Sequence, residues 1–365
     1  MDKNVLVLGM GKVGSLVALM LRDTGFRVTG IDKNHQPDAP VPVIQADLSD
    51  QDFLTKQFAK TDAVVSCLPY RLNKPVVQAA FDTVTHYFDL TEDVPTANFI
   101  KELSGKAQSV LAPQCGLAPG FVAIVGASMA MEFDNLRSIR LRVGALPQSP
   151  QGLLGYAFNW SPEGVVNQYL NDCEVIVNGL RKMVPAMQDP ESIVIEGKKL
   201  EAFTTSGGLG TMAESFEGRV DMLNYKTIRY PGHQQAMKFY FHELLLKNNR
   251  ELAGEILVNA LPPVNNDVVY VYVAVDGWKN MSGRKEHLRD EFVRSYYPIT
   301  IHGKTWRAIS WTTACSVCAV MELVFSGKLP QKGFLRQEDI RLGDFLATRN
   351  GRLYAGNTTL GQHSK

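Results

Sequence analysis

The amino end of the chain carries a glycine pattern that sharply limits what the first domain can fold into. An apolar run, Val5-Leu6-Val7-Leu8, leads into Gly9-Met10-Gly11-Lys12-Val13-Gly14, and the next apolar run ends on Asp32. The first glycine of such a pattern lets the chain turn sharply off a strand, the second leaves room for a phosphate, and the third lets the following helix pack closely. The later acid accepts hydrogen bonds from ribose hydroxyls. The pattern therefore predicts a dinucleotide-binding strand–turn–helix.

The cofactor is expected to lie at the carboxyl ends of the strands, where open parallel sheets bind ligands and helix N-termini hold phosphates. Asp32 favours NAD because its carboxylate repels a 2′-phosphate, whereas the neighbouring Lys33 offsets part of that repulsion, so NADP stays an alternative. The alternative to the whole site is a glycine-rich turn without a ligand. The predicted cofactor-binding residues are Gly9, Gly11, Lys12, Val13, Gly14, Asp32, Asp47, Leu48, Ser66, Leu68 and Pro69.

The alternation of short β-rich runs and helical segments over residues 1–120 predicts an α/β fold with a doubly wound parallel sheet, the Rossmann fold. Beyond residue 120 the β-like segments lengthen, as at 138–144 and 268–275, with helices expected at 162–170 and 236–247. This pattern predicts a second, α+β domain over residues 121–310 with a largely antiparallel sheet. Helices in 311–350 are expected to return to the first domain, and the tail after Leu353 to be loosely ordered.

The bulk composition argues against some classes of partner. A net charge of +1, with 21% charged residues, gives no reason to expect nucleic acid or an anionic membrane surface. No run approaches the roughly 18 consecutive apolar residues that span a bilayer, and the first strand leaves no room for a signal peptide. Five cysteines argue for reduced thiols in a cytoplasmic protein. No metal is expected, because Cys315-x-x-Cys318 lies in an apolar, helix-like run that favours buried cysteines.

Two polar clusters stand out in the second domain. The loop at 204–211, with Ser206, can offer hydroxyl and N–H groups to a carboxylate; a solvent-exposed hairpin loop is the alternative. The segment 225–233 collects two cations, two phenols and a histidine. Arg229 can clamp a substrate carboxylate with two hydrogen bonds, and Lys226 or His233 can move protons. A strand that ends in a turn, with charges on its wet face, is the alternative.

In the first domain, the fifth predicted strand ends in an acidic segment. Asp89 is expected to point toward the site, where it binds a substrate ammonium group or accepts its proton, and Asp93 to cap the next helix. Cys115 follows the sixth predicted strand. Its thiol is expected either to face the cofactor cleft or to have a packing role.

These motifs together resemble the saccharopine reductase and lysine 6-dehydrogenase group of the saccharopine dehydrogenase family. The resemblance covers nearly all of residues 1–350, and the segment 225–233 is most similar to the lysine 6-dehydrogenase side. The motifs that carry it are Gly9-x-Gly11-x-x-Gly14, Cys67-Leu68-Pro69-Tyr70, and the segments 86–91, 116–120, 144–148, 206–208 and 225–233.

The resemblance implies a Rossmann domain, an α+β domain for substrate binding and dimerisation, and hydride transfer between a nicotinamide and a carbon that bears nitrogen. It implies that Asp89 and Arg229 hold the amino-acid head or the amine, and that Lys226 or His233 relays the proton. Tyr70, Cys115 and Ser206 are expected to contact the substrate. Expected substrates are lysine, saccharopine or another amino acid or diamine such as carboxynorspermidine, and the expected assembly is a homodimer. The non-enzymatic alternative is an NAD-sensing protein without turnover.

Overall fold

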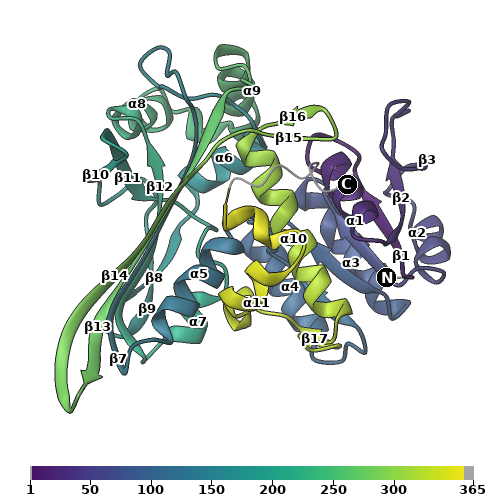
Figure 1. Ribbon diagram of the computed structural model, residues 1–365. Helices are drawn as coiled ribbons and strands as arrows, with labels where there is room; N and C mark the ends of the chain where they lie inside the picture. The colour runs from purple at the N-terminus through teal and green to yellow at the C-terminus, as the bar shows by residue number, and fades with distance from the viewer. Residues whose placement is uncertain (1, 357–365) are drawn as a thin grey trace. The chain divides into compact units, whose positions relative to one another are not determined.

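The computed structural model describes residues 2–356, which form two compact units (Figure 1). Unit 1 comprises residues 2–124 and 310–356, and unit 2 comprises residues 125–309. The tail predicted beyond Leu353 lies, from residue 357 on, outside the described residues.

Unit 1 is built on a seven-stranded parallel sheet with the order β17-β6-β5-β4-β1-β2-β3. The inner part of this order, 3-2-1-4-5-6, is that of a doubly wound dinucleotide-binding sheet, which confirms the predicted Rossmann fold. The strands are β1 (Asn4–Leu8), β2 (Arg27–Asp32), β3 (Val43–Gln45), β4 (Ala63–Ser66), β5 (His86–Asp89), β6 (Val110–Ala112) and β17 (Gly333–Phe334). The sequence analysis missed β17, which is only two residues long.

Helices α1 (Gly14–Asp23), α2 (Gln51–Phe58), α3 (Asn73–Asp82) and α4 (Val94–Ser104) connect these strands. Valine, isoleucine and leucine fill the strands because a parallel sheet between helices is buried on both faces. The side chain of Asp93 accepts a hydrogen bond from the Thr96 N–H over 2.9 Å, so the predicted cap of α4 is confirmed.

The long helix α10 (Ala308–Phe325) belongs mostly to unit 1, which also contains α11 (Leu342–Ala347). By length and composition α10 is long and apolar enough to cross a membrane, which the sequence analysis missed because polar residues interrupt its apolar run. In the structure 83% of it is buried, and a core helix passes the same test. Cys315 and Cys318 are fully buried on α10, as predicted.

Unit 2 contains a mixed sheet with the path β10-β11-β12-β7-β13-β14 and a hairpin, β8–β9, attached to β12. All its pairs are antiparallel except β12 with β7, so the sheet is largely antiparallel, as predicted. The strands are β7 (Asn135–Pro147), β8 (Cys173–Val177), β9 (Leu180–Val184), β10 (Glu191–Ile195), β11 (Lys198–Thr204), β12 (Val220–Arg229), β13 (Asp267–Met281) and β14 (Arg284–Tyr296). A small separate sheet pairs β15 (Ile299–Ile301) with β16 (Lys304–Trp306).

The helices that accompany this sheet are α5 (Phe121–Ala130), which crosses the boundary between the units, α6 (Pro162–Leu170), α7 (Met212–Phe216), α8 (His233–Lys238) and α9 (Arg250–Ala260). The prediction of a single helix over residues 236–247 is wrong. The chain forms α8, a π-helical turn η2 (Phe239–Glu243) and a short 3-10 turn η3 (Leu246–Asn248). Leu245 interrupts the helix because its φ of +58° is left-handed.

Candidate functional site

The glycine loop after β1 has the geometry that a bound pyrophosphate requires. Gly9 adopts φ +84°, which favours glycine, and a Cβ atom on Gly14 would lie 1.8 Å from the Gly9 carbonyl oxygen. A Cβ atom on Gly11, in contrast, would meet nothing within 4 Å. The first and third glycines are therefore required by the protein's own backbone, whereas the space at Gly11 is open to a ligand. Among residues 2–356, no side chain caps the N-terminus of α1, where helix N–H groups hold anions.

Asp32 ends β2 and fixes the shape of this loop. Its Oδ2 accepts a hydrogen bond from the Met10 N–H over 2.7 Å, and its Oδ1 accepts one from the Asn34 N–H over 2.8 Å. Since each carboxylate oxygen has two acceptor positions, one on each oxygen stays available for a ribose hydroxyl. Asp32 therefore fits its predicted role and also holds the glycine loop against the sheet.

The two predicted cofactor contacts after β3, Asp47 and Leu48, differ in their exposure. Asp47 is exposed, and hydrogen bonds from the backbone N–H and then the hydroxyl of Ser49, each over 2.9 Å, hold the pKa of Asp47 below its ordinary value. Leu48 is buried in the apolar core with Leu54 and Phe58. The structure thus offers the Asp47 carboxylate, but not the Leu48 side chain, to a ligand.

The predicted ligand contacts after β4 also differ in their exposure. The Ser66 hydroxyl is buried and donates to Asn73 Oδ1 over 2.7 Å, so it ties β4 to α3. Leu68 is half-buried, and its Cδ2 lies 3.0 Å from the position of a Cβ on Gly9. Pro69 is exposed, and Tyr70, which begins the 3-10 turn η1 (Tyr70–Leu72), is half-buried. Leu68 thus lies against the glycine loop of unit 1, and ligand contacts of Pro69 and Tyr70 stay predictions.

Asp89 is fully buried at the end of β5, where it joins neighbouring strand ends. Its Oδ1 accepts from the N–H groups of Thr91 (3.0 Å) and Gln114 (2.9 Å), and its Oδ2 from the Tyr87 hydroxyl (2.8 Å) and Asn73 Nδ2 (3.4 Å). Burial raises the pKa of Asp89 to about 6. All four acceptor positions are filled, so the structure gives Asp89 a role in the fold, and its contact with a substrate stays a prediction.

Cys115 is also fully buried. Its thiol donates to the Ala112 carbonyl over 3.2 Å and accepts from Gln337 Nε2 over 3.2 Å. Burial raises the pKa of Cys115 well above its ordinary value, so the thiol keeps its proton at neutral pH. These contacts favour the packing role over the predicted substrate contact.

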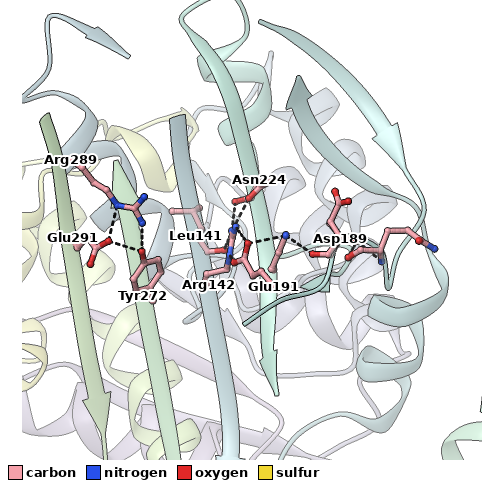
Figure 2. Close-up of polar contacts among 11 residues, drawn as sticks. Leu141, Arg142, Asp189, Glu191, Asn224, Tyr272, Arg289 and Glu291 are labelled. Atoms are coloured by element: carbon pink, nitrogen blue, oxygen red, sulfur yellow. Dashed lines mark hydrogen bonds and ion pairs between the residues drawn. The ribbon is translucent and has the colours of Figure 1, made fainter. Parts of the chain in front are cut away.

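In unit 2, Lys226 belongs to a partly buried ion-pair network, of which Figure 2 labels Glu191 and Arg142. Its Nζ donates to Glu191 Oε2 over 3.0 Å and to the Asp189 carbonyl over 2.5 Å. Glu191 also pairs with Arg142, whose Nη1 donates to Asn224 Oδ1 over 2.7 Å. Burial lowers the pKa of Lys226. The Lys226 ammonium is thus engaged within the fold.

Arg229 lies three residues further along β12, on the other face of the strand, because successive side chains of a strand point to opposite faces. Its Nε donates to the Tyr169 hydroxyl over 2.7 Å and its Nη1 to the Ile228 carbonyl over 2.8 Å. The side chain is 2% exposed. The predicted site needs Lys226 and Arg229 close together. The structure instead places them on opposite faces of β12.

The Arg229 guanidinium is surrounded by tyrosines. Its carbon lies 4.7 Å from the centre of the Tyr156 ring and 5.7 Å from that of Tyr169. Within residues 2–356 it has no carboxylate partner, and its Nη2 makes no hydrogen bond. A buried cation without a counter-ion is costly, so this arrangement favours an anionic ligand.

His233 begins α8 and is joined to Arg229 through Tyr169. Its Nε2 lies 2.9 Å from the Tyr169 hydroxyl and its Nδ1 2.8 Å from the Leu154 carbonyl oxygen. Burial, and then the charge of Arg229, lower the pKa of His233 to about 3, so the imidazole is neutral. Tyr169 could not be predicted from the sequence, because it lies on α6, 60 residues before Arg229, with no local pattern to mark it.

The loop at 204–211 packs against the same strand. The Ser206 hydroxyl donates to the Asp172 carbonyl over 2.8 Å, so it is engaged within the fold. A Cβ atom on Gly208 would lie 2.2 Å from Tyr225 Cε1, which explains why the loop has a glycine there. The hydroxyl of Thr205 is buried and, among the described residues, has no hydrogen-bond partner. Thr205 rather than Ser206 therefore has the uncommitted hydroxyl.

The fold and the glycine loop define a nicotinamide-dinucleotide-binding protein of two units. Residues 5–112 match the family model of the saccharopine dehydrogenase NADP binding domain, and residues 116–347 match that of the saccharopine dehydrogenase C-terminal domain. The chain therefore belongs to the saccharopine dehydrogenase family, which confirms the resemblance drawn from the motifs.

Curated relatives match part of the chain. The chain is 28% identical over 192 residues to a saccharopine dehydrogenase [NADP(+), L-glutamate-forming] from Saccharomyces cerevisiae, covering 49% of this chain and 43% of that protein. It is 26% identical over 195 residues to a mitochondrial alpha-aminoadipic semialdehyde synthase from Rattus norvegicus, covering 48% and 21%. The matches thus span less than half the length of these relatives.

A solved structure shows the same fold over nearly the whole chain. It is an apo saccharopine dehydrogenase (L-Glu forming) from Saccharomyces cerevisiae, with a TM-score of 0.70 and 18% sequence identity. The match covers 92% of this chain and 94% of that chain. This agreement extends the predicted fold class to both units.

Proposed function

We propose that this chain is a nicotinamide-dependent oxidoreductase that acts on a carbon–nitrogen bond of an amino acid, of the lysine 6-dehydrogenase or saccharopine dehydrogenase type. Family membership and the names of the relatives support the reaction class. One observation carries the substrate class: the buried guanidinium of Arg229 has no counter-ion among the described residues. A substrate carboxylate supplies that charge.

Arg229 has the donors that such a substrate needs. Tyr169 occupies Nε and the Ile228 carbonyl occupies one N–H of Nη1, so one N–H of Nη1 and both of Nη2 stay available. Two of these bind the two oxygens of a carboxylate side by side. The hydroxyl of Thr205 is a further buried donor in this unit.

In unit 1 the glycine loop and Asp32 hold the cofactor, which when bound accepts or donates a hydride. Oxidation of the amine also removes a proton from its nitrogen. Of the three groups predicted for this task, Lys226 is engaged in an ion pair and His233 has a pKa of about 3. Asp89, with a pKa raised by burial to about 6, is the one whose pKa suits a proton acceptor near neutral pH, and it must give up one of its four hydrogen bonds to take the proton.

We also propose that the enzyme prefers NAD, although its relatives are named for NADP(+), because the carboxylate of Asp32 repels a 2′-phosphate. A reducing, cytoplasmic location is supported by the five cysteines, all free thiols in the structure. A homodimer is supported by large apolar side chains exposed on β9 and β10 of unit 2, namely Leu180, Met183 and Val194. Light scattering of the purified protein tests the dimer.

The experiment that tests the proposed function is a substrate panel. Purified protein is mixed with NAD⁺ or NADP⁺ and with lysine, saccharopine or carboxynorspermidine, and the absorbance of the reduced nicotinamide is followed. The proposal predicts reduction with at least one of these amino acids. Tight nucleotide binding without turnover on any of them contradicts it and favours the nucleotide-sensing alternative.

A further inference from the structure

We propose that Tyr169 and His233 are positioning residues that hold the Arg229 guanidinium in the orientation in which it receives a carboxylate. The inference rests on the proposed role of Arg229 and adds to it the device that fixes this side chain. It also gives His233 a different task from the proton relay that the sequence suggested.

The hydrogen bonds around Tyr169 have only one possible direction. Arginine can only donate, so the Tyr169 hydroxyl accepts the bond from Nε over 2.7 Å. Its single proton then goes to its other partner, Nε2 of His233, over 2.9 Å. The Nδ1 of His233 lies 2.8 Å from the Leu154 carbonyl oxygen, which only accepts, so the imidazole proton is on Nδ1.

The series of hydrogen bonds therefore runs from Arg229 through Tyr169 and His233 to the Leu154 carbonyl, with each group donating to the next. Arg229, Tyr169 and His233 are each at most 2% exposed, so water does not compete for these bonds. Such bonds are strong where the local dielectric is low. They fix the Nε edge of the guanidinium and leave the edge formed by Nη1 and Nη2 for a ligand.

Aromatic rings pack against Arg229 and His233, the first and last side chains in this series of hydrogen bonds. The Tyr156 ring lies 4.7 Å from the guanidinium carbon, and its own hydroxyl accepts from Trp160 Nε1 over 3.0 Å. The Phe203 ring is stacked on the His233 ring at an interplanar angle of 17°. These contacts limit the rotation of both Arg229 and His233.

His233 is suited to this task and not to proton relay. A relay must gain and lose a proton near neutral pH, whereas burial lowers the pKa of His233 to about 3. A second proton would also leave Nε2 without a lone pair for the Tyr169 hydroxyl. The neutral Nδ1–H form is the one that keeps every bond in this series.

The kinetic test uses three variants of the full chain with the amino acid found in the substrate panel. Tyr169→Phe removes the hydroxyl and His233→Leu removes both ring nitrogens, and we expect each to raise KM for the amino acid about tenfold or more with kcat changed much less. His233→Gln keeps one donor and one acceptor, so its KM stays within a few-fold of the unmutated value. The control is Tyr240→Phe, since the Tyr240 hydroxyl donates to the Ala253 carbonyl elsewhere in unit 2.

A second readout does not depend on turnover. Nitrogen NMR of the His233 ring is expected to show the neutral Nδ1–H form throughout about pH 5–8, with a shifted Nε2 resonance in Tyr169→Phe. An Nε2–H form or a charged ring at neutral pH overturns the inference, as does an unchanged KM in Tyr169→Phe when the unmutated protein turns over. Absence of turnover in the unmutated protein contradicts the proposed function instead, and the NMR result then decides the inference separately.

Discussion

The Nε of Arg229 donates a hydrogen bond of 2.7 Å to the hydroxyl of Tyr169, and no carboxylate among the described residues pairs with this buried guanidinium. The bond directs one edge of the cation into the protein, and in the proposed function a substrate carboxylate balances its charge. The same chain carries a glycine loop that is open only at Gly11. In the proposed function, the first feature binds the substrate carboxylate and the second binds the dinucleotide.

Arg229→Lys is expected to raise KM for the amino-acid substrate by roughly 10- to 100-fold, because lysine keeps the charge but loses the paired donors and the bond to Tyr169. Steady-state kinetics at saturating cofactor measure the effect. Arg181→Lys is the matched control, since Arg181 pairs with Glu217 on the surface. A KM for Arg229→Lys equal to that of the control contradicts the assigned role.

Asp32→Ser is expected to shift the ratio of NAD⁺ to NADP⁺ affinity toward NADP⁺ by about tenfold or more, because the carboxylate that repels a 2′-phosphate is removed. Titration calorimetry with both cofactors measures it. Asp38→Ser, in the exposed loop after β2, is the control. Equal affinities for the two cofactors in the unmutated protein would argue against the NAD preference.

Gly11→Ala and Gly14→Ala are expected to differ although the change is identical. A methyl group on Gly11 has space, so stability should stay within about 0.5 kcal/mol while cofactor affinity falls. A methyl group on Gly14 meets the Gly9 carbonyl oxygen, so this variant should lose about 2 kcal/mol or more. Urea unfolding and cofactor titration check both, and equal effects of the two variants contradict the geometry.

His233 is expected to make the protein less stable in acid. Its pKa is about 3 in the fold and about 6.5 in the unfolded chain, so below about pH 6.5 the unfolded state binds the extra proton. The stability is present above pH 6.5 and falls, by at most ~1.4 kcal/mol per pH unit, as the pH drops toward 3. Urea unfolding across this range should give a flatter profile for His233→Gln, and parallel profiles would show that His233 is not buried as a neutral group.

Glu191→Gln is expected to lower the stability of unit 2 by about 1–3 kcal/mol, because Arg142 and Lys226 lose the carboxylate they share. Since this network lies on the other face of β12 from Arg229, KM for the amino acid should change less than twofold, within the ordinary scatter of distant sites. Thermal unfolding and kinetics check the pair of outcomes. A large rise in KM would show that the two faces are coupled.

Local features of the sequence predicted much of unit 1. The sequence predicts the cap at Asp93 and the glycine loop, because each depends on residues close together in the chain. The sequence marks the segment 225–233 as a polar cluster, yet which of its side chains meet depends on the alternation of β12. Only the strand assignment shows that Lys226 and Arg229 point to opposite faces.

The parts that could not be predicted depend on distant contacts. Tyr169 reaches Arg229 and His233 from another element, 60 and 64 residues away in sequence. Asp89 accepts from the N–H of Gln114, 25 residues away, and Cys115 contacts Gln337, 222 residues away in sequence. The break in the predicted helix at 236–247 occurs at Leu245, a residue type that seldom adopts positive φ.

A requirement for the substrate carboxylate decides whether Arg229 binds the substrate as proposed. The measurement compares kcat/KM for the amino acid that is oxidised with kcat/KM for the amine that lacks only its carboxylate, such as lysine against its decarboxylated diamine. Loss of two charge-assisted hydrogen bonds predicts a preference of about 100-fold or more for the amino acid, and a much smaller preference in Arg229→Met. Equal kcat/KM values for the two compounds in the unmutated enzyme would contradict the account.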